Sequence, residues 1–165
     1  MEKKVIVVNK EKCTGCKICE FVCSLYHENE INPIKSRIQI ISWEIEGIDV
    51  PMVCQQCEDA PCAEVCPTNA IYRNRQTGAL LIHKEVCIGC RMCISVCPFG
   101  GCSINPDTEE VIKCDLCEGE PKCVEFCPTQ ALEYIPVSKA VLAKKRVAAQ
   151  RLGDLFQTLP TAYIS

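Results

Sequence analysis

Hydrophobic positions along this chain fall into short runs separated by polar residues, rather than into long periodic stretches. Apolar and β-branched residues gather at residues 5–8, 79–82 and 111–112. Runs of this length and composition are typical of short strands. No apolar run approaches the roughly 20 residues that a membrane-spanning helix needs, so the sequence predicts no direct membrane span.

A hairpin and two returning strands are expected between these runs. Residues 38–43 and 48–50 flank a turn at residues 46–47, which predicts two antiparallel strands. Residues 70–72 and 131–135 each follow a Cys-Pro-Thr segment and predict strands that turn back along the body. With short helices around the last cysteine of each group described below, the expected fold class is α+β.

The tail from about residue 137 to residue 157 has a different pattern. It lacks cysteine, and Val141, Ala148 and Leu152 recur near helical spacing among lysines and arginines. This pattern predicts an amphipathic helix. Such a helix either packs on the body of its own chain or serves as a docking arm for a partner subunit.

Cysteine is unusually abundant in this chain, and this bears on how the fold is stabilised. The chain has 17 cysteines in 165 residues and only 5% aromatic residues. A cysteine share above roughly 8–10% indicates a crosslinked or metal-bound scaffold. Because so small an apolar core rarely offsets chain entropy, the fold is expected to need crosslinks or metal.

The spacing of the cysteines discriminates between disulfide bonds, structural zinc sites and iron–sulfur clusters. Disulfides are disfavoured because the start of the chain lacks a signal-peptide pattern and the cysteine count is odd. Structural zinc sites use two well-separated pairs of ligands, which three cysteines at successive three-residue steps, followed by a fourth, do not suit. Sixteen cysteines instead form four groups of four, as iron–sulfur clusters require. The groups are Cys13, Cys16, Cys19 and Cys23; Cys54, Cys57, Cys62 and Cys66; Cys87, Cys90, Cys93 and Cys97; and Cys114, Cys117, Cys123 and Cys127.

Groups one and three follow the bacterial ferredoxin spacing C-x2-C-x2-C-x3-C, whereas groups two and four lengthen the middle gap. Groups one and three resemble each other, as do groups two and four, which indicates a duplicated two-cluster unit. A proline follows the last cysteine of groups two, three and four and breaks helix continuation there. Ser24 takes that place in group one, and little effect is expected because Cys23 remains. Gly15 and Gly89 allow backbone angles in the loops that a side chain would resist.

With these motifs, the chain resembles the four-cluster ferredoxin-like electron-transfer subunits of molybdenum and tungsten oxidoreductases, such as those of dimethyl sulfoxide reductase and formate dehydrogenase. The resemblance covers roughly residues 3–135. Segments 23–30, 32–39 and 51–62 are most similar to the small subunits that accompany tungsten aldehyde oxidoreductase and tungsten benzoyl-CoA reductase.

The resemblance implies a ligand assignment for four [4Fe–4S] clusters that the repeat alone does not give. It also implies two ferredoxin-like domains, one inserted in the other: residues 1–50 with 100–136, and residues 51–99, followed by the tail 137–165. The implied ligand sets are Cys13, Cys16, Cys19 and Cys127; Cys114, Cys117, Cys123 and Cys23; Cys54, Cys57, Cys62 and Cys97; and Cys87, Cys90, Cys93 and Cys66.

Four thiolates saturate a cubane, so the clusters are expected to relay single electrons and the chain to be no enzyme by itself. The expected partner is a large tungsten- or molybdenum-pterin subunit, with a flavin subunit or soluble ferredoxin as electron exchange partner. The alternatives are a free cytoplasmic polyferredoxin, or the iron–sulfur subunit of a formate dehydrogenase, CO dehydrogenase or hydrogenase complex. Oxygen-sensitive clusters predict an anaerobic, cytoplasmic setting.

Charge and the remaining candidate residues complete the expectations. The formal charge of −3 falls to about −11 when each of four sites adds about −2, which disfavours nucleic acid and suits a basic partner surface. Lys17 and Arg91 either raise the potential of a nearby cluster or are simply solvated. His27 is interpreted as a polar surface residue and His83 as structural. Cys102 lies outside the four groups and is interpreted as a buried small residue, with a replacement ligand or reactive thiol as the alternative.

Overall fold

The computed structural model describes residues 3–142, 145 and 149. Within these residues the strands form antiparallel pairs, each a separate two-stranded sheet. Three pairs join strands that follow one another along the chain, and the fourth joins the first strand to the last. The pairs are β1 (Lys4–Val8) with β8 (Leu132–Pro136), β2 (Ile38–Trp43) with β3 (Ile48–Val53), β4 (Ile71–Arg73) with β5 (Leu80–Ile82), and β6 (Cys102–Ile104) with β7 (Val111–Lys113).

Short helices lie at the end of each cysteine group. Three of them stop within two residues of the group's last cysteine, where the following proline prevents the helix from continuing. The fourth, α1, runs on for five residues past Cys23. The α-helices are α1 (Ile18–Glu28), α2 (Pro61–Glu64), α3 (Met92–Val96) and α4 (Lys122–Glu125), and the 3-10 turns are η1 (Lys10–Lys12), η2 (Pro33–Lys35) and η3 (Leu116–Gly119).

Ser24 explains why α1 is longer than its counterparts. Without a proline after Cys23, the backbone hydrogen bonding of the helix continues to Glu28. The Ser24 side chain is fully buried; its hydroxyl donates to the Phe21 carbonyl at 3.0 Å and accepts from the Asn32 amide at 3.0 Å. The substitution therefore shapes this segment more than the sequence led us to expect, although Cys23 stays in the core.

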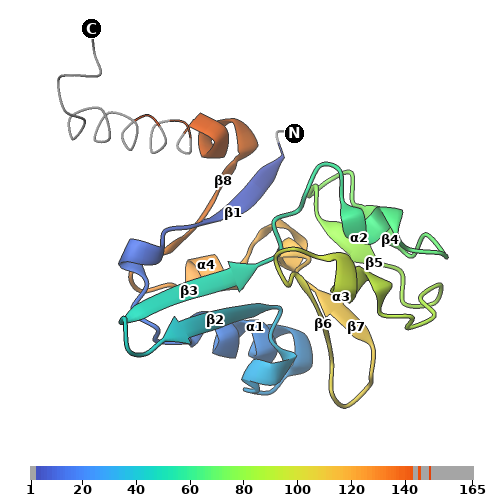
Figure 1. Ribbon diagram of the computed structural model, residues 1–165, viewed down its shortest axis with the longest axis horizontal. Helices are drawn as coiled ribbons and strands as arrows, with labels where there is room; N and C mark the ends of the chain where they lie inside the picture. The colour runs from blue at the N-terminus through green and yellow to red at the C-terminus, as the bar shows by residue number, and fades with distance from the viewer. Residues whose placement is uncertain (1–2, 143–144, 146–148, 150–165) are drawn as a thin grey trace, which may run out of the picture.

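The elements gather into two halves (Figure 1). One half contains β1, β2, β3, β8, α1 and α4, and the other contains α2, α3 and the strands β4 to β7. Since β1 pairs with β8, the first and last strands of the body lie side by side. Each half has its own buried cluster, and cysteines form a large part of both. The first includes Ile6, Ile38, Val53, Leu116 and Leu132, and the second includes Ala60, Ile71, Leu80 and Val111.

The expected strands occur within one to three residues of their predicted bounds. Strand β6 was not expected, because its Cys-Ser-Ile sequence follows two glycines and lacks an alternating pattern. The tail becomes helical at residue 137 as predicted and is helical through residue 142, while most of the remaining expected helix lies outside the described residues. In the part of the chain that is described, no helix has both the length and the apolar character needed to cross a membrane.

Candidate metal centres

Cysteines from the two ends of the chain meet in one recess of the first half. Cys13, Cys16 and Cys19 enter it from the loop after η1 and the start of α1, and Cys127 enters it from the segment after α4. We call these four residues set A. The apolar side chains of Ile40, Pro51 and Leu132 complete the walls. A recess with four sulfur donors and apolar walls suits a soft metal cluster rather than a polar ligand.

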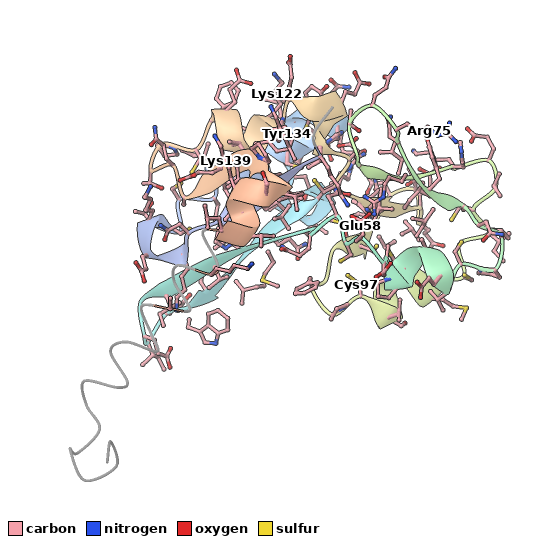
Figure 2. The ribbon with its side chains drawn as sticks, turned by 90° about the horizontal axis from the view of Figure 1, so that it is seen from above. Glu58, Arg75, Cys97, Lys122, Tyr134 and Lys139 are labelled. Atoms are coloured by element: carbon pink, nitrogen blue, oxygen red, sulfur yellow. The ribbon has the colours of Figure 1, made fainter. Side chains whose placement is uncertain are left out.

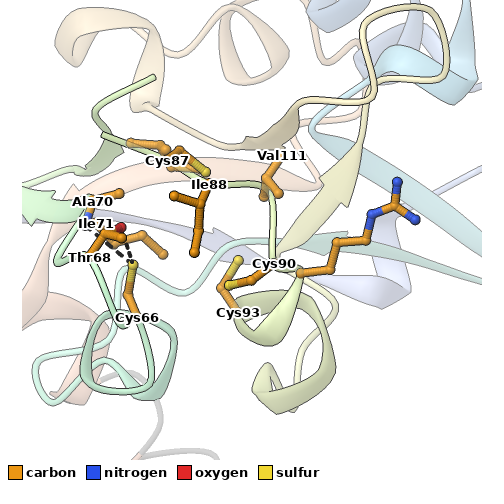
Figure 3. Close-up of a pocket in the computed structure, with 11 residues that line it drawn as sticks. Cys66, Thr68, Ala70, Ile71, Cys87, Ile88, Cys90, Cys93 and Val111 are labelled. Atoms are coloured by element: carbon orange, nitrogen blue, oxygen red, sulfur yellow. Dashed lines mark hydrogen bonds between the residues drawn. The ribbon is translucent and has the colours of Figure 1, made fainter. Parts of the chain in front are cut away.

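A second recess has the same composition in the other half (Figure 3). Cys87, Cys90 and Cys93 surround it from the loop before α3 and from α3 itself, and Cys66 faces them from the segment after α2. We call these four residues set D. Its walls are again apolar, formed by Ile71, Ile82, Ile88 and Val111.

The remaining eight cysteines of the four groups fall into two further neighbourhoods. Burial raises the pKa of Cys123, and the nearby Cys114, Cys23, Cys117 and Cys19 raise it further; because Cys19 already belongs to set A, the other three and Cys123 are called set B. Burial also raises the pKa of Cys57, with further contributions from Cys54, Cys62 and Cys97; these four are set C. Cys97 lies beside α2 (Figure 2).

Several of these thiols resist ionisation in the absence of a metal. Burial raises the pKa of Cys19 to about 12 and that of Cys117 to about 11. Burial also raises the pKa of Cys114, whose thiol lies in the core. Because metals bind the thiolate, loading these sites must release protons, and the free energy of metal binding is coupled to folding.

The last cysteine of a group receives a backbone N–H donor on its sulfur in three of the four groups. Such donors stabilise negative charge on sulfur, and hydrogen bonds to cluster sulfurs help to set a cluster's reduction potential. The donors are Arg37 to Cys23 at 3.3 Å, Ala70 to Cys66 at 3.3 Å, and Gly101 to Cys97 at 3.2 Å.

The loops of groups one and three share an unusual backbone. Gly15 and Gly89 have φ values of 64° and 66°, as their predicted role requires. Lys17 and Arg91, two residues later, also have positive φ and sit at the first cap of α1 and α3. These alternating left-handed residues curl the chain so that successive cysteines turn toward one recess.

His27 is not the polar surface residue that the sequence indicated. Its side chain is 8% exposed, and its Nε2 lies 3.4 Å from Asp115 Oδ1 and 3.8 Å from Cys117 Sγ. Burial and the neighbouring Arg37 lower the pKa of His27 to about 4, so the ring is neutral at pH 7. His83, by contrast, stacks on Tyr72 with ring centroids 3.9 Å apart, in agreement with a structural role.

Three buried residues complete the surroundings of the sulfurs. Cys102 is 4% exposed, as expected for a small core residue, and its thiol lies beside that of Cys62. Sequence reasoning missed Gln56 and Lys113, which contact Cys114 and Cys54 through their side chains. In the sequence, only their position next to cysteines pointed to such contacts, and many solvated residues of this chain have a similar position.

Known proteins with this sequence pattern carry iron–sulfur clusters. Residues 45–160 match the 4Fe-4S dicluster domain, and residues 10–26 match a 4Fe-4S binding domain. The polyferredoxin-like subunit of aliphatic sulfonate oxidoreductase from Pyrococcus furiosus is 44% identical over 126 residues, covering 76% of this chain and 72% of that protein.

Two proteins of Escherichia coli K12 and one solved structure extend the comparison. The electron transport protein HydN is 38% identical, covering 82% of this chain and 90% of HydN. A subunit of anaerobic dimethyl sulfoxide reductase is 34% identical, covering 93% of this chain and 79% of that subunit. The BamBC active site complex of benzoyl coenzyme A reductase, as isolated, contains a chain with the same fold at a TM-score of 0.50 and 22% identity, covering 99% and 95%.

The donor sets fit such clusters, since each offers four sulfurs and no competing carboxylate lines the two recesses. This chain belongs to the family of 4Fe-4S dicluster proteins, and it is an electron-transfer protein that binds several [4Fe–4S] clusters.

Proposed function

We propose that this chain is the electron-transfer subunit of an oxidoreductase complex and carries four [4Fe–4S] clusters, one on each of sets A to D. The observation that carries this proposal is the gathering of sixteen cysteines into four sets of four, each built from two separate chain segments. A bound cubane would accept or give one electron at each site. Since a thiolate would occupy each iron of such a cubane, the chain itself is proposed to be non-catalytic.

Each set has a cysteine that lies near a cysteine of the next set. Cys123 of set B lies close enough to Cys19 of set A for their charges to interact, and Cys114 of set B is similarly close to Cys54 of set C. Cys93 of set D interacts in the same way with Cys62 of set C. These contacts support the order A–B–C–D for an electron path through the protein.

The two outer sets of this proposed path, A and D, reach the surface. Cys16 of set A and Cys90 of set D are exposed, whereas every cysteine of set B is buried. Val86, Ile88 and Met92 are exposed apolar side chains on the loop that supplies set D. We infer that electrons enter at one outer cluster and leave at the other, where partner proteins approach.

Two ferredoxin-like domains, one inserted in the other, account for the two halves of the fold. Pairing of β1 with β8 closes the outer domain around sets A and B. The hairpin of β6 and β7 contacts α3 and β5. Those contacts support a second boundary near residue 113 instead of residue 99, so that the inserted domain spans about residues 54–113.

The proposed partner is a catalytic tungsten- or molybdenum-pterin subunit in an anaerobic cytoplasm, with a flavin subunit or soluble ferredoxin at the other end of the path. Relatives whose names describe parts of sulfonate oxidoreductase and dimethyl sulfoxide reductase support a catalytic partner. HydN, named as an electron transport protein, favours the alternative of a freely exchanging polyferredoxin or a subunit of another redox complex.

Iron and sulfide analysis of the anaerobically purified protein tests the cluster assignment. We expect about 16 iron atoms and as many sulfides per chain. Cys127→Ala should remove about four irons, while the matched control Cys102→Ala should keep them all. Equal iron loss in both variants, or zinc without sulfide in the wild type, would overturn the assignment.

Copurification under the same conditions tests the partner. A pterin-containing subunit that stays bound through gel filtration is the expected result. A loaded chain that elutes alone, and that reduces or oxidises other soluble redox proteins at ordinary rates, would favour the polyferredoxin instead.

A further inference from the structure

The ammonium group of Lys113 is buried beside a proposed cluster ligand. This last residue of β7 is 4% exposed. Its Nζ lies 3.3 Å from Cys54 Sγ and donates to the Leu80 carbonyl at 2.8 Å. Burying an ammonium group is costly unless hydrogen bonds and an opposite charge compensate for it.

The compensating charge is not a carboxylate. Among the ion pairs found in the described residues, Lys113 takes part in none. A neutral thiol is a weak hydrogen-bond acceptor and offers an ammonium group little. The thiolates of a bound cluster supply the missing negative charge, so the position of Lys113 makes electrostatic sense only when set C is loaded.

The backbone holds this ammonium between the two central sets. Lys113 pairs with Cys102 in the β6–β7 ladder and directly precedes Cys114 of set B, while its side chain reaches Cys54 of set C. In the hydrogen bonds of residues 3–142, no other lysine or arginine side chain donates to a cysteine sulfur. This direct contact between an ammonium group and a sulfur is therefore specific to one of the four proposed sites.

We infer that Lys113 is a positioning residue that raises the reduction potential of the set C cluster, so that an electron entering the chain rests there. The inference rests on the proposed assignment of set C. A fixed cation beside the sulfurs stabilises the reduced cluster, which carries one more negative charge, more than the oxidised one. With clusters bound, the set C cluster would gain one electron that a neighbouring cluster would lose, and no bond would form or break.

A redox titration of the loaded protein, followed by electron paramagnetic resonance, tests this inference. Lys113→Met removes the charge with little change in volume. We expect one of the resolved midpoint potentials to become more negative, with the reduced-to-oxidised ratio of that cluster falling at least tenfold at a fixed potential. A tenfold change corresponds to about 59 mV for a one-electron couple. Lys113→Arg should keep most of the wild-type potential.

Lys84→Met is the matched control, because it removes the same charge from an exposed lysine paired with Glu110. Its potentials should stay close to those of the wild type. If Lys113→Met with full iron content keeps all its potentials, or shifts them no more than Lys84→Met does, the inference is wrong. If Lys113→Met does not take up iron, Lys113→Gln replaces it; loss of iron in both, with full iron in Lys113→Arg, would assign a purely structural role and also overturn the inference.

The wild-type data separate this inference from the proposal beneath it. A wild type without four clusters would refute the ligand assignment. A wild type with four clusters and unshifted variants would refute only the role of Lys113.

Discussion

Gln56 joins the two halves of the fold through a buried side chain, and replacing it gives a sharp test of how they are held together. The residue is 1% exposed. Its Nε2 donates to the Cys114 carbonyl at 2.9 Å, and its Oε1 accepts from the Leu80 amide at 2.7 Å. In Gln56→Leu the size is nearly kept, but both backbone groups lose their partner in the core.

The cost follows from those two groups. A buried polar group left without a hydrogen bond costs about 1–3 kcal/mol, so the variant should lose about 2–6 kcal/mol. That is a large part of the roughly 5–15 kcal/mol that stabilises a typical domain. Because Cys114 belongs to set B and Leu80 contacts Lys113 beside set C, the loss should appear as faster release of clusters.

The assay is the rate at which the visible cluster absorbance disappears in guanidinium chloride under anaerobic conditions. A kinetic measurement is appropriate because cluster loss makes unfolding irreversible. A loss of about 2 kcal/mol that acts wholly on the unfolding rate accelerates it about thirtyfold. Gln55→Leu is the control, since within the described part of the chain the Gln55 side chain donates only to the nearby Val53 carbonyl. Equal rates for the two variants would refute the assigned role of Gln56.

Three further outcomes are expected. Gly15→Ala and Gly89→Ala should destabilise the loaded protein by similar amounts, about 1–2 kcal/mol each, because both positions have positive φ; the Asp49 carboxylate, which a Cβ at Gly15 would meet at 2.6 Å, is the free end of a side chain and can turn away. A loss of thermal stability at Gly15 well above that at Gly89 would contradict this. Ser24→Pro, which restores the Cys-Pro pattern, should nevertheless cost about 3 kcal/mol because it interrupts α1; unchanged thermal stability and circular dichroism would speak against that interpretation. Chelating the iron should unfold the chain, since cysteines form much of both buried clusters; a fully apo sample with native-like circular dichroism would refute it.

Short-range spacing explains why much of this molecule could be predicted. Cysteines three residues apart, with Gly15 or Gly89 between them, specify how a loop curls, and a proline after the last cysteine specifies where the helix ends. The strands followed from local runs of β-branched residues. Deviations occurred where a local rule lacked its usual residue, as at Ser24, where α1 continues to Glu28.

Contacts between distant segments could not be predicted in this way. Gln56 and Cys114 are 58 positions apart, and Lys113 and Cys54 are 59 apart. Nothing in the residues around them distinguishes these polar side chains from solvated ones. The prediction of His27 as a surface residue was wrong for the same reason. Its burial depends on Asp115 and Arg37, which other parts of the chain supply. The combination of cysteines into sets came from a family resemblance and not from the repeat.

The pairing of β1 with β8 has a consequence for biosynthesis. The partner of the first strand, residues 132–136, is among the last parts of the body to leave the ribosome. Bringing such distant segments together carries the full entropy of closing the long loop between them. In the proposed assignment, Cys13, Cys16 and Cys19 must wait for Cys127, whereas sets C and D need nothing beyond Cys97. The inserted half can therefore receive its iron while the rest is still being made, and the earliest cysteines of the chain remain unprotected the longest.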